Sequence, residues 1–195
     1  MNAIKTTVAF AIGAAFATSA LAQNADSIVQ RDVNQQTRIE QGLKSGQLST
    51  GEASQLERGE ARIERTEARD LSKGPLTQQE KTQINHMQNA ESRAIYQDKH
   101  NGIVGNPNSA SSQRMQADVQ RNVNQQRRVE QGLRSGSLTN REAGHLERGQ
   151  AHVNQKEARA GRDGYVGARE QHQIQGAENR QSSRIYAAKH DGAHR

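Results

Sequence analysis

Apolar residues recur at helical spacing along the first half of the chain, and polar residues fill the positions between them. At 100° per residue, the members of each apolar series fall on one narrow stripe of a helix. A helix with so narrow a stripe is marginal by itself, so each helix is expected to need neighbours. Three stripes are present: Val29, Val33, Ile39 and Leu43; Leu56 and Ile63; and Ile84, Met87 and Ile95. They predict helices near residues 29–44, 50–70 and 78–98.

The second half of the chain repeats the first. The segment VNQQTRIEQGLKSGQL at 33–48 returns as VNQQRRVEQGLRSGSL at 123–138. The offset of 90 residues holds without a gap from about Val29 to Gly102. The repeat therefore predicts three further helices, near residues 119–134, 140–160 and 168–188.

The segment between the copies, NGIVGNPNSASSQR, is rich in Gly, Asn, Ser and Pro, as linkers are. We therefore expect an all-α protein with two tandem copies of a three-helix unit joined by a flexible linker. The copies would span residues 23–102 and 116–195, with the linker at 103–115. The sequence leaves open whether the copies pack together and whether the chain forms oligomers.

The N-terminal segment 1–22 is predicted to be a signal peptide. An apolar run follows Lys5, the only charged residue of the segment, and the triplet ALA at 20–22 has the small-x-small pattern of a cleavage site. The run is too short for a comfortable membrane span of about 20 residues, which disfavours the alternative of a retained anchor helix. We expect cleavage between Ala22 and Gln23, and a periplasmic or extracellular protein without a transmembrane span.

The composition of the remaining chain predicts a thin core. It has three aromatic residues, Tyr96, Tyr165 and Tyr186, few large aliphatic residues and no cysteine. Such a composition borders on that of disordered chains, and disulfides cannot compensate. Order is expected to come from helix propensity, capping, thin apolar seams or a partner.

Four octets share a glycine, an aliphatic residue two positions later and a glutamate six positions later. We expect each octet to join two helices. In the first, Gly46 would end a helix in the left-handed conformation, and Ser49 and Glu52 would form a capping box. The pairs Thr77–Glu80 and Thr139–Glu142 are expected to form the same capping box. The octets are SGQLSTGE at 45–52, KGPLTQQE at 73–80, SGSLTNRE at 135–142 and DGYVGARE at 163–170.

The same octets are similar to the second half of an EF-hand loop, whose final glutamate binds calcium. The first two aspartates of such a loop are missing, and Arg159 and Gly161 stand in their places before DGYVGARE. Calcium binding is therefore not expected of the octets. Asp163 and Glu170 are the candidate ligands of the alternative, a metal-binding loop. In this octet the cap position is Gly167, a weaker but accepted choice.

Both copies carry N-Q-x-x-R-[IV]-x-Q-G, then S-G-x-L-[ST]-x-x-E-A-x-x-L-E, and a closing I-Y-x-x-K-H. Before the closing motif, residues 163–170 follow D-G-x-[ILV]-T-x-x-E except at Gly167, and residues 73–80 follow it except at Lys73. With these motifs the chain resembles a group of small exported proteobacterial helical repeat proteins with degenerate EF-hand-like loops. Residues 33–53, 163–170 and 185–190 match best, and the resemblance covers nearly all of both copies. The chain departs from the pattern at 73–75, where an acidic residue is lost, and at Gly167, where the cap hydroxyl is lost. The resemblance implies a helical periplasmic or secreted protein and no established activity.

The closing motif offers candidate contact residues at the end of each copy. At a helix terminus, lysine and histidine complement the helix dipole, and the tyrosine would pack over the apolar stripe. Alternatively, tyrosine and histidine, four residues apart on one face, contact a partner or bind a soft metal ion. The candidates for partner contact are Tyr96, Lys99 and His100, and their counterparts Tyr186, Lys189 and His190.

The histidines raise the question of a zinc or copper site. His145 and His152 would lie about 10 Å apart along a helix, too far to chelate one ion alone. His190, Asp191 and His194 could bind a metal ion through a flexible C-terminal tail. They are the second set of candidate metal ligands.

The two copies differ in net charge. The chain has a net charge of +6 and a pI near 10.0. Residues 26–102 carry 11 basic against 12 acidic residues, whereas residues 116–192 carry 13 against 9. A basic second half favours anionic partners such as lipopolysaccharide. Acids and bases alternate throughout, however, which favours an ordinary solubilising surface with its carboxylates on exposed polar faces.

The residues argue against catalysis and against nucleic-acid binding. The chain has no cysteine, and GLKSG and GLRSG place serine one position away from a G-x-S-x-G elbow. Stacking aromatic residues are missing, and export also disfavours nucleic acid. We expect a non-enzymatic exported protein without a cofactor, which acts as an interaction or envelope-stress component and binds an unknown protein or an anionic envelope component. The alternative is a periplasmic divalent-metal buffer or sensor that uses the loops and histidines.

Overall fold

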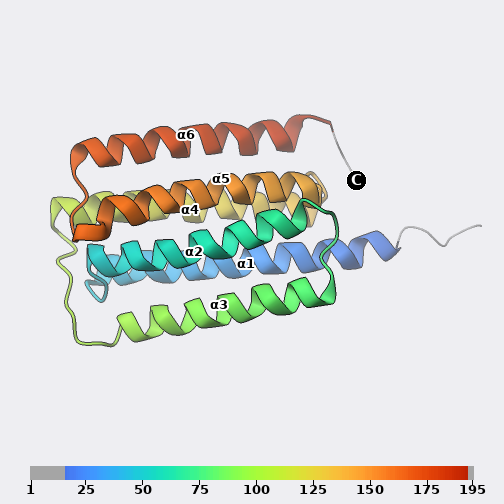
Figure 1. Cartoon of the computed structure of the whole chain (residues 1–195). Coiled ribbons are helices and arrows are strands. Elements are labelled where there is room, and N and C mark those ends of the chain that lie inside the picture. Colours follow the sequence, from blue (N-terminus) through green and yellow to red (C-terminus); the bar gives the residue numbers. More distant parts are fainter. Residues whose placement is uncertain (1–15, 193–195) are drawn as a thin grey trace, which may run out of the picture.

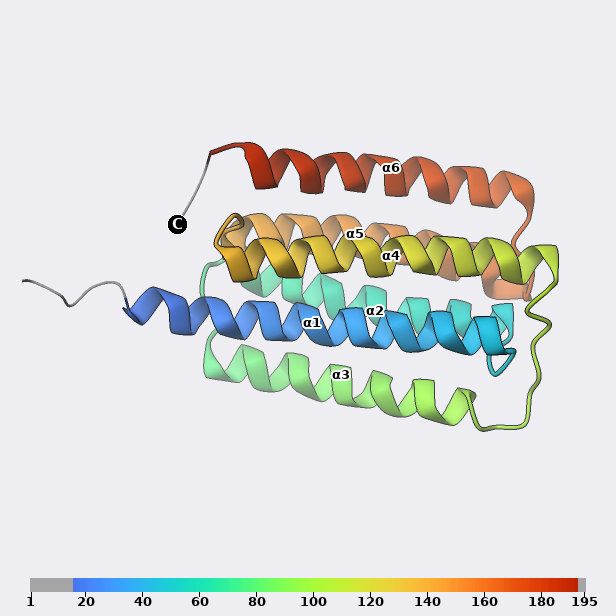
Figure 2. The same ribbon diagram turned by 180° about the vertical axis from the view of Figure 1, so that it is seen from behind.

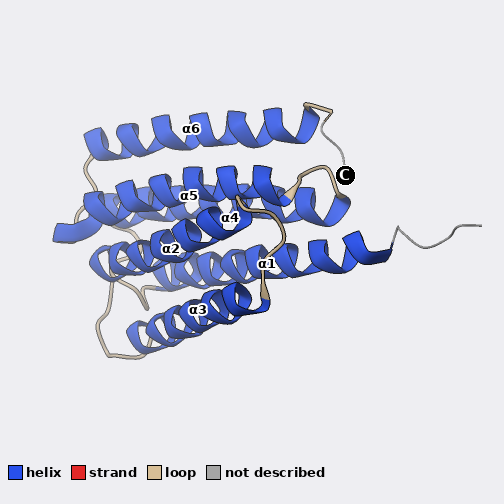
Figure 3. Cartoon of the chain, turned by 45° about the vertical axis from the view of Figure 1, so that its right-hand side comes forward, coloured by secondary structure: helices blue, strands red, loops and turns tan. Residues whose placement is uncertain are grey.

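The computed structural model describes residues 16–192, and the side chains of residues 25–192. All regular elements in this part are helical and it contains no strand, which confirms the all-α prediction (Figure 3). The predicted signal peptide at 1–22 lies outside the residues whose side chains are described. The helices are α1 (Phe16–Ser45), α2 (Thr50–Leu71), α3 (Gln78–Asp98), α4 (Ala110–Ser135), α5 (Asn140–Ala160), the short 3₁₀ helix η1 (Gly161–Asp163) and α6 (Ala168–His190) (Figure 1).

Helices α2, α3, α5 and α6 begin at the predicted residues, but α1 and α4 begin earlier than their apolar stripes. Helix α4 begins at Ala110 because Ser109 caps it, with its hydroxyl accepting a 3.1 Å hydrogen bond from the backbone N–H of Ser112. The linker therefore ends at Ser109 rather than at residue 115. The N–H of Gly105 donates a 2.8 Å hydrogen bond to the carbonyl of Gly46, which fastens the linker to the first helix joint.

The two copies pack together as one six-helix bundle. Helix α1 lies antiparallel against α4, and α2 lies antiparallel against α5, so equivalent helices of the two copies pair (Figures 1 and 2). Helix α3 covers α1 and α2, and α6 covers α4 and α5. This arrangement is a pseudo-two-fold one, and it provides the neighbours that the narrow apolar stripes need.

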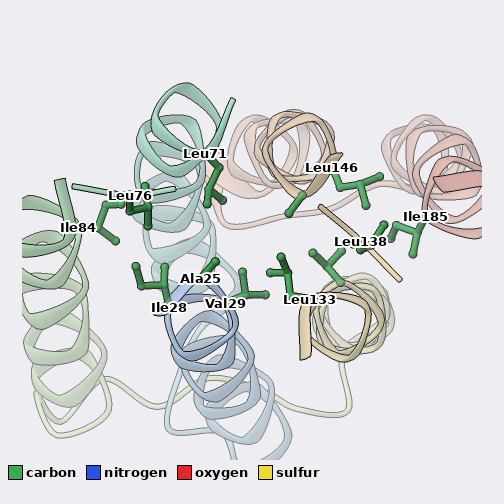
Figure 4. Packing of buried hydrophobic residues seen from close by; sticks show 12 residues of the cluster. Ala25, Ile28, Val29, Leu71, Leu76, Ile84, Leu133, Leu138, Leu146 and Ile185 are labelled. Atoms are coloured by element: carbon green, nitrogen blue, oxygen red, sulfur yellow. The ribbon is translucent and has the colours of Figure 1, made fainter. Parts of the chain in front are cut away.

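Buried aliphatic side chains gather in two clusters, one at each end of the bundle. The first unites the start of α1 with the end of α4 (Figure 4), and the second unites the end of α1 with the start of α4. Within residues 16–192, no helix is both long and apolar enough to cross a bilayer. The clusters are Ala25, Ile28, Val29, Leu71, Leu76, Ile84, Val129, Leu133, Leu138, Ala143, Leu146 and Ile185, and Ile39, Leu43, Leu48, Ala53, Leu56, Ile95, Met115, Val119, Ala160, Val166 and Ile174.

Left-handed glycines mark the same places in both copies. Gly46 has a φ of 76° and Gly136 a φ of 78°, and each follows the last residue of a long helix. Residues with a β-carbon rarely adopt this conformation, so glycine is suited to the end of a helix. The prediction for Gly46 is confirmed.

Candidate functional site

Helix α2 has two polar faces of opposite charge. Its glutamates recur every three or four residues on the side that Leu56 and Ile63 turn toward the interior. Its arginines recur on the other side. The buried glutamates are Glu57, Glu60, Glu64 and Glu67, and the arginines are Arg58, which is half-buried, and the exposed Arg62, Arg65 and Arg69. Helix α5 repeats this division, with Glu147 and Glu157 buried and Arg148 and Arg159 exposed.

The middle of the bundle is therefore acidic. None of the lysines and arginines in residues 25–192 is buried with these carboxylates. Burial raises the pKa of Asp118 and Glu147 to about 8 and that of Glu178 to about 7. The expectation that the carboxylates lie on exposed polar faces is wrong. The fully buried acids are Asp32, Glu57, Glu60, Glu64, Glu67, Asp70, Asp118, Glu147, Glu157 and Glu178. Of these, Asp70 pairs with Arg69 and Lys73, and Glu178 pairs with the half-buried Arg121.

Glutamine side chains supply hydrogen-bond donors to this interior. Nε2 of Gln36 donates to Oε2 of Glu57 at 2.9 Å, and Nε2 of Gln126 donates to Oε2 of Glu147 at 3.0 Å. These two bonds are equivalent, because each pair of partners is shifted by 90 residues. Both carboxylate oxygens of Glu60 are nevertheless buried without a donor. A carboxyl group in such surroundings favours the protonated form.

The outer side of the same helices carries a groove of about 880 Å³, which we call the basic groove. No carboxylate of residues 25–192 lines it. Arg65 donates a hydrogen bond to Gln155 across it. Within residues 25–192, no carboxylate pairs with the other three arginines of the groove. The lining residues are Arg65 of α2, His145, Arg148, Gly149, Ala151, His152, Gln155 and Arg159 of α5, and Arg184 of α6.

The electrostatic field in the basic groove is positive, and it affects the pKa of His152. Burial lowers the pKa of His152, and repulsion from Lys156, Arg180, Arg159 and Arg184 lowers it further. Acids and bases alternate in the sequence, but the fold turns most acids of α2 and α5 inward and leaves the bases outside. The expectation of an evenly mixed, solubilising surface is therefore wrong for this face.

Three of the four octets are capping boxes, as predicted. The Ser49 hydroxyl accepts a hydrogen bond from the N–H of Glu52 at 3.2 Å, and Oε2 of Glu52 accepts one from the N–H of Ser49 at 2.9 Å. The pairs Thr77–Glu80 and Thr139–Glu142 form the same two bonds. These bonds satisfy backbone donors at the helix start, which would otherwise lack partners.

The fourth octet, DGYVGARE, is also a helix joint. Oε2 of Glu170 accepts a 2.8 Å hydrogen bond from the N–H of Gly167, and Oδ1 of Asp163 accepts a 3.0 Å bond from the N–H of Tyr165. Both candidate metal ligands of this octet thus serve backbone N–H groups. The hydrogen-bond pattern is that of a turn followed by a capped helix.

The tyrosine and histidine of each closing motif stack on one another in solvent. The ring centroids of Tyr96 and His100 lie 4.2 Å apart, as do those of Tyr186 and His190. The tyrosines are 61% and 62% exposed, so the expectation that they pack over the apolar stripe is wrong. The preceding residue, Ile95 or Ile185, occupies the buried position instead.

The structure places the two closing motifs at opposite ends of the bundle, because α3 and α6 run antiparallel (Figures 1 and 2). They cannot form one contact surface. Nδ1 of His190 lies 2.7 Å from the carbonyl oxygen of Tyr186, and Lys189 donates to the carbonyl of Arg128 at 3.3 Å. Asp191 follows α6, and His194 lies outside the described residues.

The basic groove and the acidic interior were not anticipated from the sequence, although a signal was present. At 100° per residue, the arginines of α2 centre about 150° away from its buried glutamates. The glutamates fall beside Leu56 and Ile63, which is unusual for residues that are normally exposed. A helical plot of charge, in addition to one of hydrophobicity, separates the two faces.

Comparisons with protein-family models, with curated proteins and with solved structures gave no match. The resemblance to exported proteobacterial repeat proteins therefore stays a prediction that rests on the motifs alone.

Proposed function

We propose that this is a non-enzymatic exported protein that binds a polyanionic component of the cell envelope through the basic groove. The observation that carries the proposal is a groove that four arginines and two histidines line, and that no carboxylate among the described side chains lines. Guanidinium groups bind phosphate and sulfate through paired hydrogen bonds. The ligand class is therefore a molecule with several phosphate or sulfate groups.

The size and spacing of the groove support a ligand with more than one anionic group. Its volume of about 880 Å³ lies in the range of ligand sites and far exceeds that of one phosphate ion. Arg148 and Arg159 are eleven residues apart on α5, which corresponds to about 16 Å along the helix. Arg65 and Arg184 reach the groove from the neighbouring helices. An extended polyanion can contact all four guanidinium groups.

The predicted compartment narrows the ligand further. A cleaved signal peptide would place the chain outside the cytoplasm, where phosphorylated lipid headgroups and soluble polyphosphates are available. The scarcity of aromatic residues disfavours a ligand held by base stacking. Phosphorylated lipid headgroups and soluble polyphosphate share the required chemistry, and binding measurements distinguish them.

The test uses the chain from Gln23 onward. We expect retention on heparin and binding to long-chain polyphosphate, with an affinity that falls steeply as salt rises. Vesicles that contain lipid A are compared with zwitterionic vesicles. Tighter binding to the lipid A vesicles than to polyphosphate identifies a lipid headgroup, and the reverse order identifies a soluble polyanion. Binding to neither, at low salt, contradicts the proposal.

A pair of matched variants assigns the binding to the groove. Arg148→Gln with Arg159→Gln removes two charges inside the groove, whereas Arg93→Gln with Arg127→Gln removes two exposed charges elsewhere. The first variant should bind at least about 10-fold more weakly, a loss of about 1.4 kcal/mol, with a shallower salt dependence. The second should stay within about twofold of the unchanged chain, since distant exposed charges are screened by salt. Equal losses would mean that net charge, and not the groove, binds the ligand.

A further inference from the structure

The outer sides of α2 and α5 carry equivalent rows of basic residues. On α5 the row consists of four residues that line the basic groove: Arg148, His152, Gln155 and Arg159. At 100° per residue, these positions fall within about 60° of the helix circumference. The four equivalent positions of α2 fall on an equally narrow row, which we call the α2 row: Arg58, Arg62, Arg65 and Arg69. The pattern of the groove side of α5 is therefore repeated on α2.

The two rows adjoin one another. Helices α2 and α5 lie side by side and antiparallel on one face of the bundle (Figure 1). Arg65 of the α2 row donates a hydrogen bond to Gln155 of the α5 row, and both residues line the basic groove. They are also equivalent residues of the two copies, so the pseudo-two-fold axis passes between the rows. The basic groove is thus one part of a basic surface that continues onto the first copy.

The arginines of the α2 row differ in their partners. Every acid of α2 itself is buried. Arg69 pairs with the carboxylate of Asp70 at 2.8 Å, which balances its charge. Within residues 25–192, no carboxylate forms a salt bridge with Arg58 or Arg62. Arg62 is exposed and Arg58 is half-buried, so both can reach a ligand beside the groove.

Glu91 of α3 makes the two halves of this surface unequal. Its carboxylate packs over Gly59, whereas the amide of Gln181 packs over Gly149 at the equivalent place in the second copy. Burial raises the pKa of Glu91 to about 7, although the charge of Arg62 opposes the shift. When Glu91 is ionised, it offsets part of the positive charge of the α2 row. The groove is therefore the more basic half.

Two adjoining rows of cations suit a linear polyanion. Eleven residues separate the ends of each row, which corresponds to about 16 Å along a helix. The axes of packed helices lie about 8–10 Å apart. A chain of anionic groups laid along the seam between α2 and α5 therefore has guanidinium groups on both sides, and each can donate paired hydrogen bonds. A short anion placed in the groove reaches only the groove half.

We infer that the ligand is a linear polyanion of the polyphosphate class, that it lies along the seam between α2 and α5, and that Arg58 and Arg62 bind it beyond the basic groove. This inference rests on the proposed function, and it narrows the ligand from any molecule with clustered phosphate or sulfate groups to an extended chain. Such a chain contacts both copies. It therefore binds only when the copies are paired, and it stabilises the folded bundle.

The test compares long-chain polyphosphate with tripolyphosphate, using the chain from Gln23 and titration calorimetry at several salt concentrations. Arg58→Gln with Arg62→Gln should weaken the binding of long-chain polyphosphate at least about fivefold and reduce its logarithmic salt slope by about 1–2. Tripolyphosphate binding should stay within about twofold, because the short anion occupies the groove and distant charges are screened. Arg148→Gln with Arg159→Gln should weaken the binding of both ligands.

The outcomes separate this inference from the proposed function. If Arg58→Gln with Arg62→Gln leaves long-chain binding unchanged while Arg148→Gln with Arg159→Gln weakens it, the groove binds by itself and the inference fails. If neither polyphosphate binds the unchanged chain at low salt, the proposed function fails with it. Melting of each variant without ligand, followed by circular dichroism, checks that it folds.

Glu91→Gln tests the seam by a gain. It gives the first copy the residue that the second copy has at Gln181, and should tighten long-chain binding about two- to threefold at pH 8, where Glu91 is ionised. Glu130→Gln is the matched control, because it also removes a carboxylate beside an arginine, Arg134, but on α4 in the other layer of the bundle (Figure 2). This pair of variants decides the matter even if Arg58→Gln with Arg62→Gln folds poorly. Equal tightening by both, or by neither, overturns the inference.

Discussion

The amide of Asn154 donates to both carboxylate oxygens of Glu64, at 2.9 and 3.0 Å, and the two residues are 90 positions apart. They therefore occupy equivalent places in the two copies. The next residues, Arg65 and Gln155, are also equivalent and also bond to one another. The pseudo-two-fold axis passes between α2 and α5 at this point. The copies differ there because two identical carboxylates would repel, whereas a carboxylate and an amide attract.

Asn154→Asp should destabilise the bundle by about 3 kcal/mol at pH 7.5, because it places a second buried acid against Glu64 and removes two donors. Asn124→Asp makes the same change at an exposed position of α4 and should alter stability by less than about 0.5 kcal/mol. Urea unfolding followed by circular dichroism measures both. Similar stabilities for the two variants would show that the contact does not hold the copies together.

Thr139→Ala should cost about 1 kcal/mol, since it removes the hydroxyl that accepts from the N–H of Glu142 at the start of α5. Thr82→Ala, within α3, should change stability little, because its hydroxyl only bonds back to the carbonyl of Gln78. The comparison uses urea unfolding in EDTA and in Ca²⁺. If calcium selectively restored Thr139→Ala, the octet would be a metal loop and not a cap.

Stability should fall as pH rises from about 4 to 8, and Asp118 should contribute to the fall. Burial, and then the charge of Glu178, raises its pKa to about 8 against an ordinary 3.8, although Arg121 opposes the shift and Glu57 adds to it. The folded chain then binds the proton more tightly than the unfolded chain does. This contribution is fully present below pH 4 and is lost as pH rises through 8.

Asp118→Asn should therefore flatten the pH dependence and raise stability at pH 8 by about 1–3 kcal/mol, because both oxygens of Asp118 lack donors. Asp26→Asn is the control for an equal change of charge nearer the surface. Urea unfolding at pH 5 and pH 8 in EDTA gives, for each variant, the slope of the free energy of unfolding against pH. A variant whose slope equals that of the unchanged chain would rule out Asp118 as a contributor.

Polyanion binding should tighten as pH falls from about 7 to 5. In the free chain, burial and four neighbouring cations lower the pKa of His152. A bound polyanion offsets those cations and raises the pKa again, so the complex takes up a proton and is favoured at low pH. Titration of the His152 ring by NMR, with and without polyphosphate, measures the shift. In His152→Gln the binding should depend less on pH, and an unaltered dependence would exclude this histidine.

Gly149→Ala should destabilise the bundle, because the added β-carbon would lie 2.0 Å from Oε1 of Gln181. Gln181 is buried and donates to the carbonyl of Leu146, so it cannot move aside freely. Gly176→Ala, also within a helix, finds no atom closer than 3.6 Å and should stabilise by about 0.5–1 kcal/mol. Melting temperatures that move in opposite directions would support this close approach of α5 and α6, and two increases would contradict it.

The sequence by itself determined the helices and their joints. A joint such as Gly46, Ser49 and Glu52 is complete within eight residues, and its hydrogen bonds form between near neighbours. The repeat then fixed the same elements in the second copy. The early start of α4 was missed because a stripe of apolar residues does not mark a helix start, whereas the cap at Ser109 does.

Only the tertiary structure decided which polar residues are buried. Glu64 and Arg65 are adjacent and equally polar, yet Glu64 is buried and Arg65 is exposed, and a pattern of apolar and polar positions assigns both to the surface. Glu64 is buried because its donors, Asn154 and Gln126, come from the other copy. Hydrogen bonds to residues 62 and 90 positions away depend on how the copies pair, and that pairing creates the acidic interior and leaves the basic groove outside.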